Sequence, residues 1–251
     1  MVVIQSPVAA NSDAPGGPCA LCGARRLSVC SALVDDGLNR LARIADDVAL
    51  GAGAALMREG DPANHLFSIT SGAVRVYKLL PDGRRQIVGF LYPGDFLGFG
   101  AGDRYAFSAE ALEPVTACRF RKAEYSRLVR ELPDLEGALL ERAGSELAAA
   151  QEQMLLLGRK TAQERLASFL LDTSGRQHRA GGAPGRLRLA MTRAEIADYL
   201  GLTTETVSRI TSRLKVSGLI RLLSLSEIAI LRPDALQAIA RGETGAEAAA
   251  G

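Results

Sequence analysis

Residues 192–217 read TRAEIADYLGLTTETVSRITSRLKVS, and this stretch decides how the C-terminal part of the chain is expected to fold. Thr192 is followed three residues later by Glu195, which is typical of a capping box at the start of a helix. Gly201 is expected to end this first helix, because glycine readily adopts the left-handed conformation found at helix C-termini. Thr203 or the threonine after it then caps a second helix.

The second helix has an apolar side and a polar side. At about 100° per residue, Val207, Ile210 and Leu214 fall together on one side. Two short helices joined by a tight turn form a helix-turn-helix, whose second helix fits a DNA major groove. A helical hairpin in a core is the alternative, but it would not usually leave polar residues clustered near the start of its second helix. The residues expected to meet DNA are Thr203, Glu205, Ser208, Arg209 and Ser212.

The composition fits a globular protein with room for two domains. The chain has 251 residues, of which 47% are hydrophobic, and a formal net charge of +2. Charged partners therefore have to be inferred from local patches. Between residues 159 and 232 there are thirteen Lys and Arg against six Asp and Glu, a surplus suited to phosphate contacts. The sequence lacks a membrane-spanning apolar window and a signal peptide, so we expect a cytoplasmic protein with no membrane partner.

Three of the four cysteines lie close together near the N-terminus. Cys19, Cys22 and Cys30 form the pattern C-x2-C-x7-C, and Cys118 stands far downstream. Disulfides are not expected in a reducing cytoplasm, so these thiols indicate a soft metal centre. Four thiolates can hold zinc or an iron–sulfur cluster, and thiols without a ligand role are the third possibility. Zinc sites of four cysteines usually have two C-x2-C pairs, and the single pair here favours a cluster.

Short β-rich runs separated by turn residues fill the middle of the chain. Glycine and proline mark the turns, as in Pro81-Asp82-Gly83 and Pro93-Gly94-Asp95. Strands at such even spacing predict an antiparallel roll or barrel. The expected strands cover residues 56–57, 65–70, 73–80, 86–92, 105–112 and 115–120.

A long helical pattern follows from residue 133 to residue 157. Its apolar positions are spaced alternately three and four residues apart, which is typical of a coiled-coil seam. We interpret it as the helix of a parallel homodimer, and the alternative is a helix buried on its own roll. A dimer would set two recognition helices about 34 Å apart and require a palindromic site. The residues expected at the dimer interface are Leu140, Ala143, Leu147, Ala150, Met154 and Leu157.

The remaining patterns complete a winged helix-turn-helix. A helix over 161–173, a glycine-rich loop over 174–185 and a strand over 187–191 precede it, and runs 219–223 and 228–231 form the wing. The predicted fold class is α+β: an N-terminal antiparallel β-roll, a long dimerisation helix and a C-terminal winged helix-turn-helix. The expected parts are a flexible cysteine-bearing leader (1–31), a β-roll sensor domain (32–132), a dimerisation helix (133–158), a DNA-binding domain (159–241) and a disordered tail (242–251).

This order of parts resembles the CRP/FNR superfamily of bacterial transcription regulators, whose roll is a jelly roll of the cyclic-nucleotide-binding type. The stretch TRAEIADYLGLTTETVSRITSRLKVSGLI is similar to the FNR branch, whose recognition helix carries E-x-x-S-R, here Glu205, Ser208 and Arg209. Arginine can pair with both guanine acceptors, glutamate can accept from a cytosine amine, and serine can meet a neighbouring base pair. The resemblance implies a homodimer that binds an inverted repeat of the TTGAT type.

The cysteine pattern is similar to that of FnrN/FixK-type members of the FNR branch, in which such cysteines hold an oxygen-labile [4Fe-4S] cluster. The resemblance implies that Cys19, Cys22, Cys30 and Cys118 are the ligands of a cluster. It also implies an oxygen-responsive activator of anaerobic or microaerobic genes. Residues 148–150 of the seam are all alanine, so the signal can act through dimerisation or through reorientation of the DNA-binding domains. A zinc-stabilised or cluster-free regulator that responds to another signal is the alternative.

Other activities fit the sequence less well. Cyclic nucleotide binding in this superfamily needs a Glu for the ribose and an Arg-Ser or Arg-Thr pair for the phosphate, and residues 94–108 lack both. We therefore expect no cyclic AMP partner. The loop 81–85 is similar in place to a roll loop that touches RNA polymerase in family activators, although a solvated turn would look alike. Catalytic triads, a P-loop and paired acids are missing, so we expect no enzyme and no catalytic residue.

Overall fold

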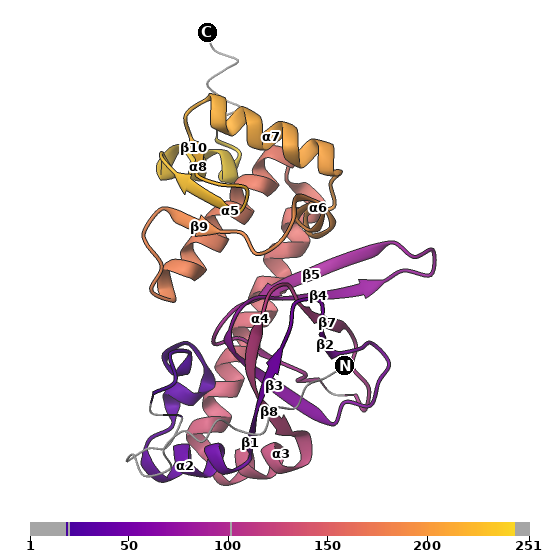
Figure 1. Cartoon of the computed structure of the whole chain (residues 1–251), viewed down its shortest axis with the longest axis vertical. Coiled ribbons are helices and arrows are strands. Elements are labelled where there is room, and N and C mark those ends of the chain that lie inside the picture. The colour runs from indigo at the N-terminus through magenta and orange to yellow at the C-terminus, as the bar shows by residue number, and fades with distance from the viewer. Residues whose placement is uncertain (1–18, 20, 101, 244–251) are drawn as a thin grey trace. The chain divides into compact units, whose positions relative to one another are not determined.

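The computed structural model describes residues 19, 21–100 and 102–243. The chain divides into two compact units, Met1–Leu147 and Ala148–Gly251. Helix α4 (Pro133–Arg159) runs through the boundary between them (Figure 1). The boundary therefore falls inside the helix that we expected to stand as a separate part. The expected leader before Cys19 and the expected tail after residue 243 lie outside the described residues.

Two antiparallel sheets of four strands form the β-roll, which confirms the prediction from the even strand spacing. One sheet has the order β1-β8-β3-β6 and the other the order β2-β7-β4-β5. A single apolar core draws side chains from both sheets, among them Phe67, Ile69 and Val74. The strands are β1 (Ala45–Leu50), β2 (Ala55–Met57), β3 (His65–Ser71), β4 (Val74–Leu79), β5 (Arg85–Leu91), β6 (Phe96–Leu97), β7 (Ser108–Ala111) and β8 (Val115–Arg121).

Sequence patterns do not reveal β1 or β6. In β1 the exposed acids Asp46 and Asp47 precede the two buried residues Val48 and Leu50, so an alternating pattern appears only at its end. Strand β6 has only two residues, which is too short for any periodic signal. The expected run 105–112 is a strand only at its centre, in β7.

Two helices within the expected roll region are also missed by the sequence patterns. They are α2 (Asp35–Arg43) and α3 (Lys122–Glu131). Each is short and rich in charged residues, so its apolar face is narrow. Helix α2 buries Leu38 and Leu41, and α3 buries Tyr125 in the same core.

The described part of the expected leader packs against the roll. It forms two short 3-10 helices, η1 (Arg25–Leu27) and η2 (Val29–Ala32). Val29 and Leu33 are only 7% and 3% exposed. Both side chains join the core around Tyr125, and their burial stabilises the packed position of the segment.

Helix α4 buries a different side from the expected seam. Leu135 and Leu139 in its first turns pack into the core around Tyr125. The large seam side chains at positions 140, 147 and 154 are 75%, 61% and 66% exposed, whereas Leu157 is half-buried by its own chain. A helix buried on its own roll would hide these side chains. The exposed seam residues are Leu140, Ala143, Leu147, Ala150 and Met154.

The C-terminal unit is a winged helix-turn-helix, as predicted. Its three strands have the order β10-β11-β9. Helix α5 continues through residues 174–179, which we expected to be loop, because Thr173 and Ser174 are buried. Helix α8 was not apparent from the sequence patterns. The elements are α5 (Ala162–Arg179), β9 (Arg186–Arg188), α6 (Arg193–Leu200), α7 (Thr204–Val216), β10 (Ile220–Leu222), β11 (Glu227–Ile230) and α8 (Pro233–Arg241).

The predicted caps of the helix-turn-helix are confirmed. The hydroxyl of Thr192 accepts the N–H of Glu195, and the Glu195 carboxylate accepts the N–H of Thr192 in return. Gly201 ends α6 with φ 61°, in the left-handed region. The hydroxyl of Thr203 accepts the N–H of Thr206 at the start of α7. These caps fix where each helix begins and ends, and so set which side chains α7 exposes.

None of the helices in the described ranges has the length and apolarity needed to cross a lipid bilayer.

The packed side of α7 should dominate the stability of the C-terminal unit. Leu214 is 1% exposed and Val216, two residues later on the same helix, is 88% exposed. We expect Leu214→Ala to lower the free energy of unfolding by about 2–5 kcal/mol through lost burial and a residual cavity. The matched change Val216→Ala should alter it by less than about 0.5 kcal/mol. Urea unfolding followed by circular dichroism measures both, and equal effects would contradict the packing described.

Candidate functional site

The recognition helix α7 separates a packed side from a polar side, as its sequence predicts. Val207, Ile210 and Leu214 are buried against the rest of the C-terminal unit. On the other side, Glu205, Arg209 and Ser212 are exposed and Ser208 is half-buried. The polar side chains are therefore available to a ligand that lies along the helix.

Local hydrogen bonds orient the polar side chains of α7. An Nη2–H of Arg209 donates to the hydroxyl of Thr206 at 3.2 Å. The hydroxyl of Ser208 accepts from Nη1 of Arg193 at 3.3 Å. Arg193 is the first residue of α6, so this contact joins the two helices of the motif. In the sequence, Arg193 stands out only as the neighbour of the capping residue Thr192. Its contact with Ser208 could not be predicted, because the turn between the two helices brings these residues together.

Thr203 serves first as a cap. Its hydroxyl accepts the backbone N–H of Thr206 at 3.2 Å. Placed at the start of α7, it also helps to hold the carboxylate of Glu205 in its charged form. The pKa of Glu205 lies below its ordinary value because its own backbone N–H, the Thr203 hydroxyl and the Arg209 guanidinium stabilise the charge. Glu205 is therefore an acceptor at neutral pH, as a contact with a cytosine amine requires.

The second candidate site is the group of four cysteines in the N-terminal unit. Cys19 and Cys22 precede η1, Cys30 lies in η2, and Cys118 lies in the middle of β8. All four are free thiols and all are half-buried. Cys19, Cys30 and Cys118 pack against the core around Tyr125, so the fold brings the distant Cys118 to the N-terminal cysteines.

The thiols are close enough to perturb one another. Burial raises the pKa of Cys19 to about 11, with further increases from the neighbouring Cys30 and Cys22. Burial also raises the pKa of Cys30, and Cys22 adds to the effect. The pKa of Cys118 is raised by burial, by Asp47 and by the three other cysteines. Each thiolate would thus face other negative charges, which a cationic centre bound to the sulfurs would relieve.

Asp47 is a neighbour of Cys118 that sequence patterns do not identify. Its carboxylate lies 3.9 Å from the Cys118 sulfur, because β1 and β8 are paired with these residues opposite each other. Within the described residues, no three His, Cys, Asp or Glu side chains are arranged as a metal site. The donor chemistry fits a thiolate-bound metal centre, and the four sulfurs are neighbours rather than a closed set of ligands.

The roll also contains a pocket of about 300 Å³. Apolar side chains of β1 and β2 line it together with polar groups such as Asp61, His65 and Arg119.

The loop after β6 is where the superfamily pattern would bind the phosphate of a cyclic nucleotide. Here hydrogen bonds from side chains of the same chain hold this loop in place. Lys122 donates to the carbonyls of Gly100 and Gly102 at 3.1 and 3.0 Å. The Arg104 guanidinium donates to the carbonyl of Gly60.

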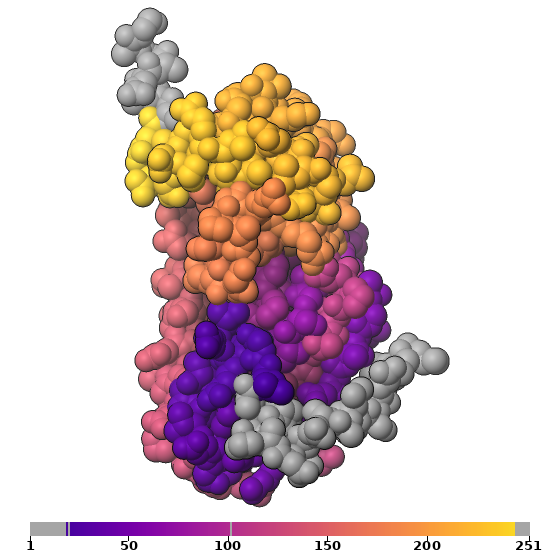
Figure 2. Space-filling view, turned by 60° about the vertical axis from the view of Figure 1, so that its left-hand side comes forward, coloured from indigo at the N-terminus to yellow at the C-terminus, as the bar shows by residue number. Residues whose placement is uncertain are grey.

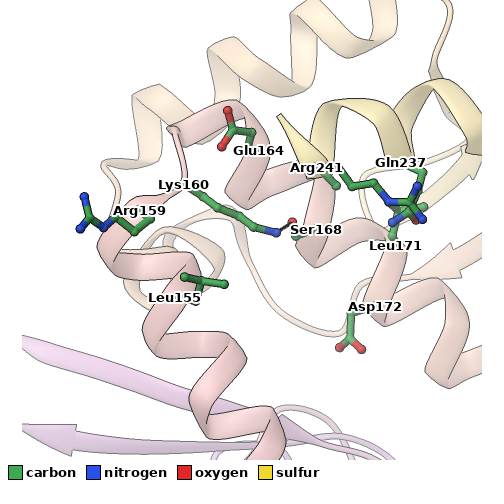
Figure 3. Close-up of a pocket in the computed structure, with 10 residues that line it drawn as sticks. Leu155, Arg159, Lys160, Glu164, Ser168, Leu171, Asp172, Gln237 and Arg241 are labelled. Carbon is green, nitrogen blue, oxygen red and sulfur yellow. Dashed lines mark hydrogen bonds between the residues drawn. The ribbon is translucent and has the colours of Figure 1, made fainter. Parts of the chain in front are cut away.

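A hollow of about 650 Å³ in the C-terminal unit lies beside α5 and α8 (Figure 3). It is lined by charged side chains of both signs, including Lys160, Asp172 and Arg241. Lys160 reaches across its wall to the Ser168 hydroxyl at 2.9 Å. No residue of α6 or α7 lines it, so the hollow is separate from the polar side of the recognition helix.

Comparison with known proteins identifies both units. Residues 47–131 match the model of the cyclic nucleotide-binding domain, and residues 164–239 match that of the Crp-like helix-turn-helix domain. The chain is 41% identical over 222 residues to the nitrogen fixation regulation protein FixK of Bradyrhizobium diazoefficiens, covering 88% of this chain and 93% of the relative. The chain belongs to the Crp/Fnr family.

Other relatives and a solved structure agree with this assignment to the Crp/Fnr family. The transcriptional activatory protein AadR of Rhodopseudomonas palustris is 41% identical over 219 residues, covering 87% of this chain and 91% of AadR. The transcriptional activator protein FnrL of Cereibacter sphaeroides is 38% identical, covering 81% of this chain and 84% of FnrL. The structure of FixK2 from Bradyrhizobium japonicum has a TM-score of 0.74 and 35% identity, covering 78% of this chain and 97% of that one.

As a Crp/Fnr family member, the chain is a DNA-binding transcription regulator and not an enzyme, as its sequence predicts. The exposed polar side of α7 belongs to the helix-turn-helix that the family model covers. Which of its residues meet bases, and whether the cysteines hold a metal centre, stay predictions.

The raised pKa of Cys19 should give the metal-free protein a specific dependence on pH. A thiol whose pKa rises on folding stabilises the folded state below its ordinary pKa of 9.0 and loses that contribution as the pH approaches about 11. We therefore expect the urea midpoint of the metal-free chain to fall between these values, and to fall less in Cys19→Ser. Parallel curves for the two proteins would show that Cys19 is not buried beside other thiols.

Proposed function

We propose that this protein is a cytoplasmic, oxygen-responsive activator of transcription that senses oxygen through a [4Fe-4S] cluster. In this proposal it binds an inverted repeat of the TTGAT type as a homodimer. The approach of Cys118 in β8 to the cysteines near the N-terminus carries the proposal, because Cys19, Cys30 and Cys118 pack against one core and Cys22 lies near enough to raise the pKa of Cys118. The cysteines lie in the N-terminal unit and the helix-turn-helix lies in the C-terminal unit, so a sensing role suits these thiols better than DNA contact.

Cys19, Cys22, Cys30 and Cys118 would hold the cluster. Four soft sulfur donors are the usual ligands of a [4Fe-4S] cluster, and such a cluster supplies a centre that oxygen can attack. The burial that raises the thiol pKa values makes unliganded thiolates costly at this place. The names of the relatives say nothing about a cofactor, so this part of the proposal rests on the residues of this chain.

A zinc-stabilised or cluster-free regulator that responds to another signal is the second candidate. Zinc can also take four thiolates, and the separation of the cysteines into one short pair and two single residues does not forbid it. Metal content distinguishes the two candidates directly.

The dimer is proposed from the exposed side of α4. Leu140, Leu147 and Met154 leave an apolar stripe open to a partner helix, and Ala143 and Ala150 between them would allow close approach. A two-fold dimer would present two copies of α7 to two half-sites, which is the geometry that an inverted repeat requires.

Activation would require a contact with RNA polymerase. The turn between β4 and β5 is exposed, and Asp82 holds its shape by accepting from the backbone N–H of Arg84 at 3.0 Å and from its Nε at 2.7 Å. We propose this turn as the polymerase contact, because a rigid charged loop is suited to docking on another protein. No cyclic AMP partner is proposed.

The cluster is tested by purifying the protein without oxygen. We expect a brown protein with four iron atoms per chain that bleaches in air, and Cys118→Ser should lose the iron, the colour and the oxygen response of a reporter gene. The control Val34→Ser changes a residue that is 66% exposed just after the N-terminal cysteines, and it should behave as wild type. A colourless wild type with one zinc, or an oxygen response that survives Cys118→Ser, would reject the cluster.

Base reading is tested on duplexes with the TTGAT half-sites intact or with the guanine replaced. Arg209→Ala should remove about 1–3 kcal/mol of discrimination at that guanine, because a bidentate pair is lost. Arg213 lies one turn further along α7, is also exposed, and is not part of the E-x-x-S-R triplet. Arg213→Ala should weaken binding to both duplexes alike. A variant at position 209 that still separates the duplexes as wild type does would refute this contact.

A further inference from the structure

The backbone of the cysteine segment, meaning residues 19 and 21–33, approaches the roll closely at one glycine. Gly94 has φ +94°, and a Cβ placed on it would lie 2.7 Å from the carbonyl oxygen of Leu27 and 2.8 Å from its carbonyl carbon. Ordinary contacts between such atoms are about 3.5–4.0 Å, so only glycine permits this approach. Leu27 lies between Cys22 and Cys30 in the sequence. The backbone between the proposed ligands Cys22 and Cys30 is therefore in direct contact with Gly94.

The turn that contains Gly94 is firmly tied to the centre of the roll. The N–H of Gly94 donates to the carbonyl of Ile69 at 2.8 Å, and the N–H of Ile69 donates to the carbonyl of Asp95 at 2.9 Å. The side chain of Asp95 closes the turn by accepting the N–H of Tyr92 at 2.8 Å. Because Gly94 and Asp95 share this bonded frame, a shift of one displaces the other.

Asp95 is in turn bound to the long helix. Its carboxylate is buried, and its Oδ1 accepts from Nη2 of Arg142 in α4 at 2.5 Å. The same Nη2 also contacts Glu146 of α4 at 2.8 Å. In the sequence, Arg142 lies between the seam residues Leu140 and Ala143. An ion pair partly removed from water is stronger and more exacting in geometry than one at the surface, so this pair can fix the position of α4 on the roll.

A second connection runs in parallel through the apolar core. Val29 and Leu33 of the cysteine segment share that core with Leu135 and Leu139 of α4. In Figure 2 the indigo surface of the N-terminal segment borders the pink surface of this helix. The cysteine segment and α4 are thus joined both by packing and by the polar route through Gly94 and Asp95.

We propose that Asp95 and Arg142 are positioning residues that transmit the state of the cysteine segment to the dimer seam of α4. While the segment is held against Gly94, the turn keeps Asp95 in place and Arg142 anchors the helix. When the segment moves away from Gly94, the turn can shift and the ion pair between Asp95 and Arg142 is weakened. Helix α4 is then held less firmly on the roll, and the dimer dissociates more readily. This inference rests on the proposed function, and it assigns the signal to dimerisation rather than to reorientation of the DNA-binding domains.

The test removes the ion pair as a whole. The double variant Asp95→Asn, Arg142→Met in the full chain avoids leaving one partner charged and buried alone. The matched control is Arg75→Met, Glu110→Gln, which removes a similarly half-buried ion pair between β4 and β7, on the other sheet. Analytical ultracentrifugation then measures the dimer dissociation constant of each protein before and after exposure to air.

We expect air to weaken the wild-type dimer by a factor within the range of about 5–150 that is typical of coupled sites. In the Asp95, Arg142 variant, air should change the dimer dissociation constant by no more than about two-fold, whereas the control should change as the wild type does. Hydrogen exchange provides a reading that needs no cluster. Coupling between two places acts in both directions. In the metal-free state, the amide hydrogens of residues 25–32 should therefore exchange faster in the Asp95, Arg142 variant than in the wild type, and the control should not show this increase.

The outcomes separate this inference from the proposed function. A wild type without iron–sulfur absorption would refute the proposed function, and this inference with it. A wild type that carries iron but has the same dimer constant before and after air would overturn this inference alone. So would an air response that the Asp95, Arg142 variant retains in full with unchanged exchange of residues 25–32.

Discussion

Burial of Tyr125 stabilises the core that joins the helices of the N-terminal unit to the roll. Its side chain is fully buried, and its ring lies 5.3 Å from that of Phe96 and 5.1 Å from that of Phe120, measured between centroids. Tilted aromatic pairs of this kind contribute about 0.5–1.5 kcal/mol beyond simple burial. The surrounding core takes side chains from η2, α2, β8, α3 and α4. Because a close-packed core resists partial rearrangement, these elements can respond to one another.

This shared core joins the cysteine segment to α4 on a roll that matches a cyclic nucleotide-binding domain. The roll has both four-stranded sheets and the turn before β6, and the long helix α4 follows it. The loop after β6 is held by Lys122, whose amine contacts two backbone carbonyls there. In the turn before β6, Gly94 lies against the backbone of Leu27 from the cysteine segment.

The sequence reveals most of the architecture, because strong periodic and capping signals mark it. The capping box at Thr192 and the glycine at 201 define the helix-turn-helix as the structure has it. Helix α2 and strand β1 are missed because charged residues interrupt their apolar pattern. Among the site residues, the E-x-x-S-R triplet is readable from spacing. Arg193, Asp47 and Asp95 are not, since their partners Ser208, Cys118 and Arg142 are brought near only by folding.

The raised pKa values of Cys19, Cys30 and Cys118 have a consequence for the reactivity of the metal-free protein. A thiol attacks electrophiles and exchanges with disulfides only as its thiolate, and burial keeps that form scarce at neutral pH. The newly made chain should therefore react slowly with peroxide and with glutathione disulfide at these three sulfurs. Burial would thus protect these sulfurs during short periods of oxidative stress.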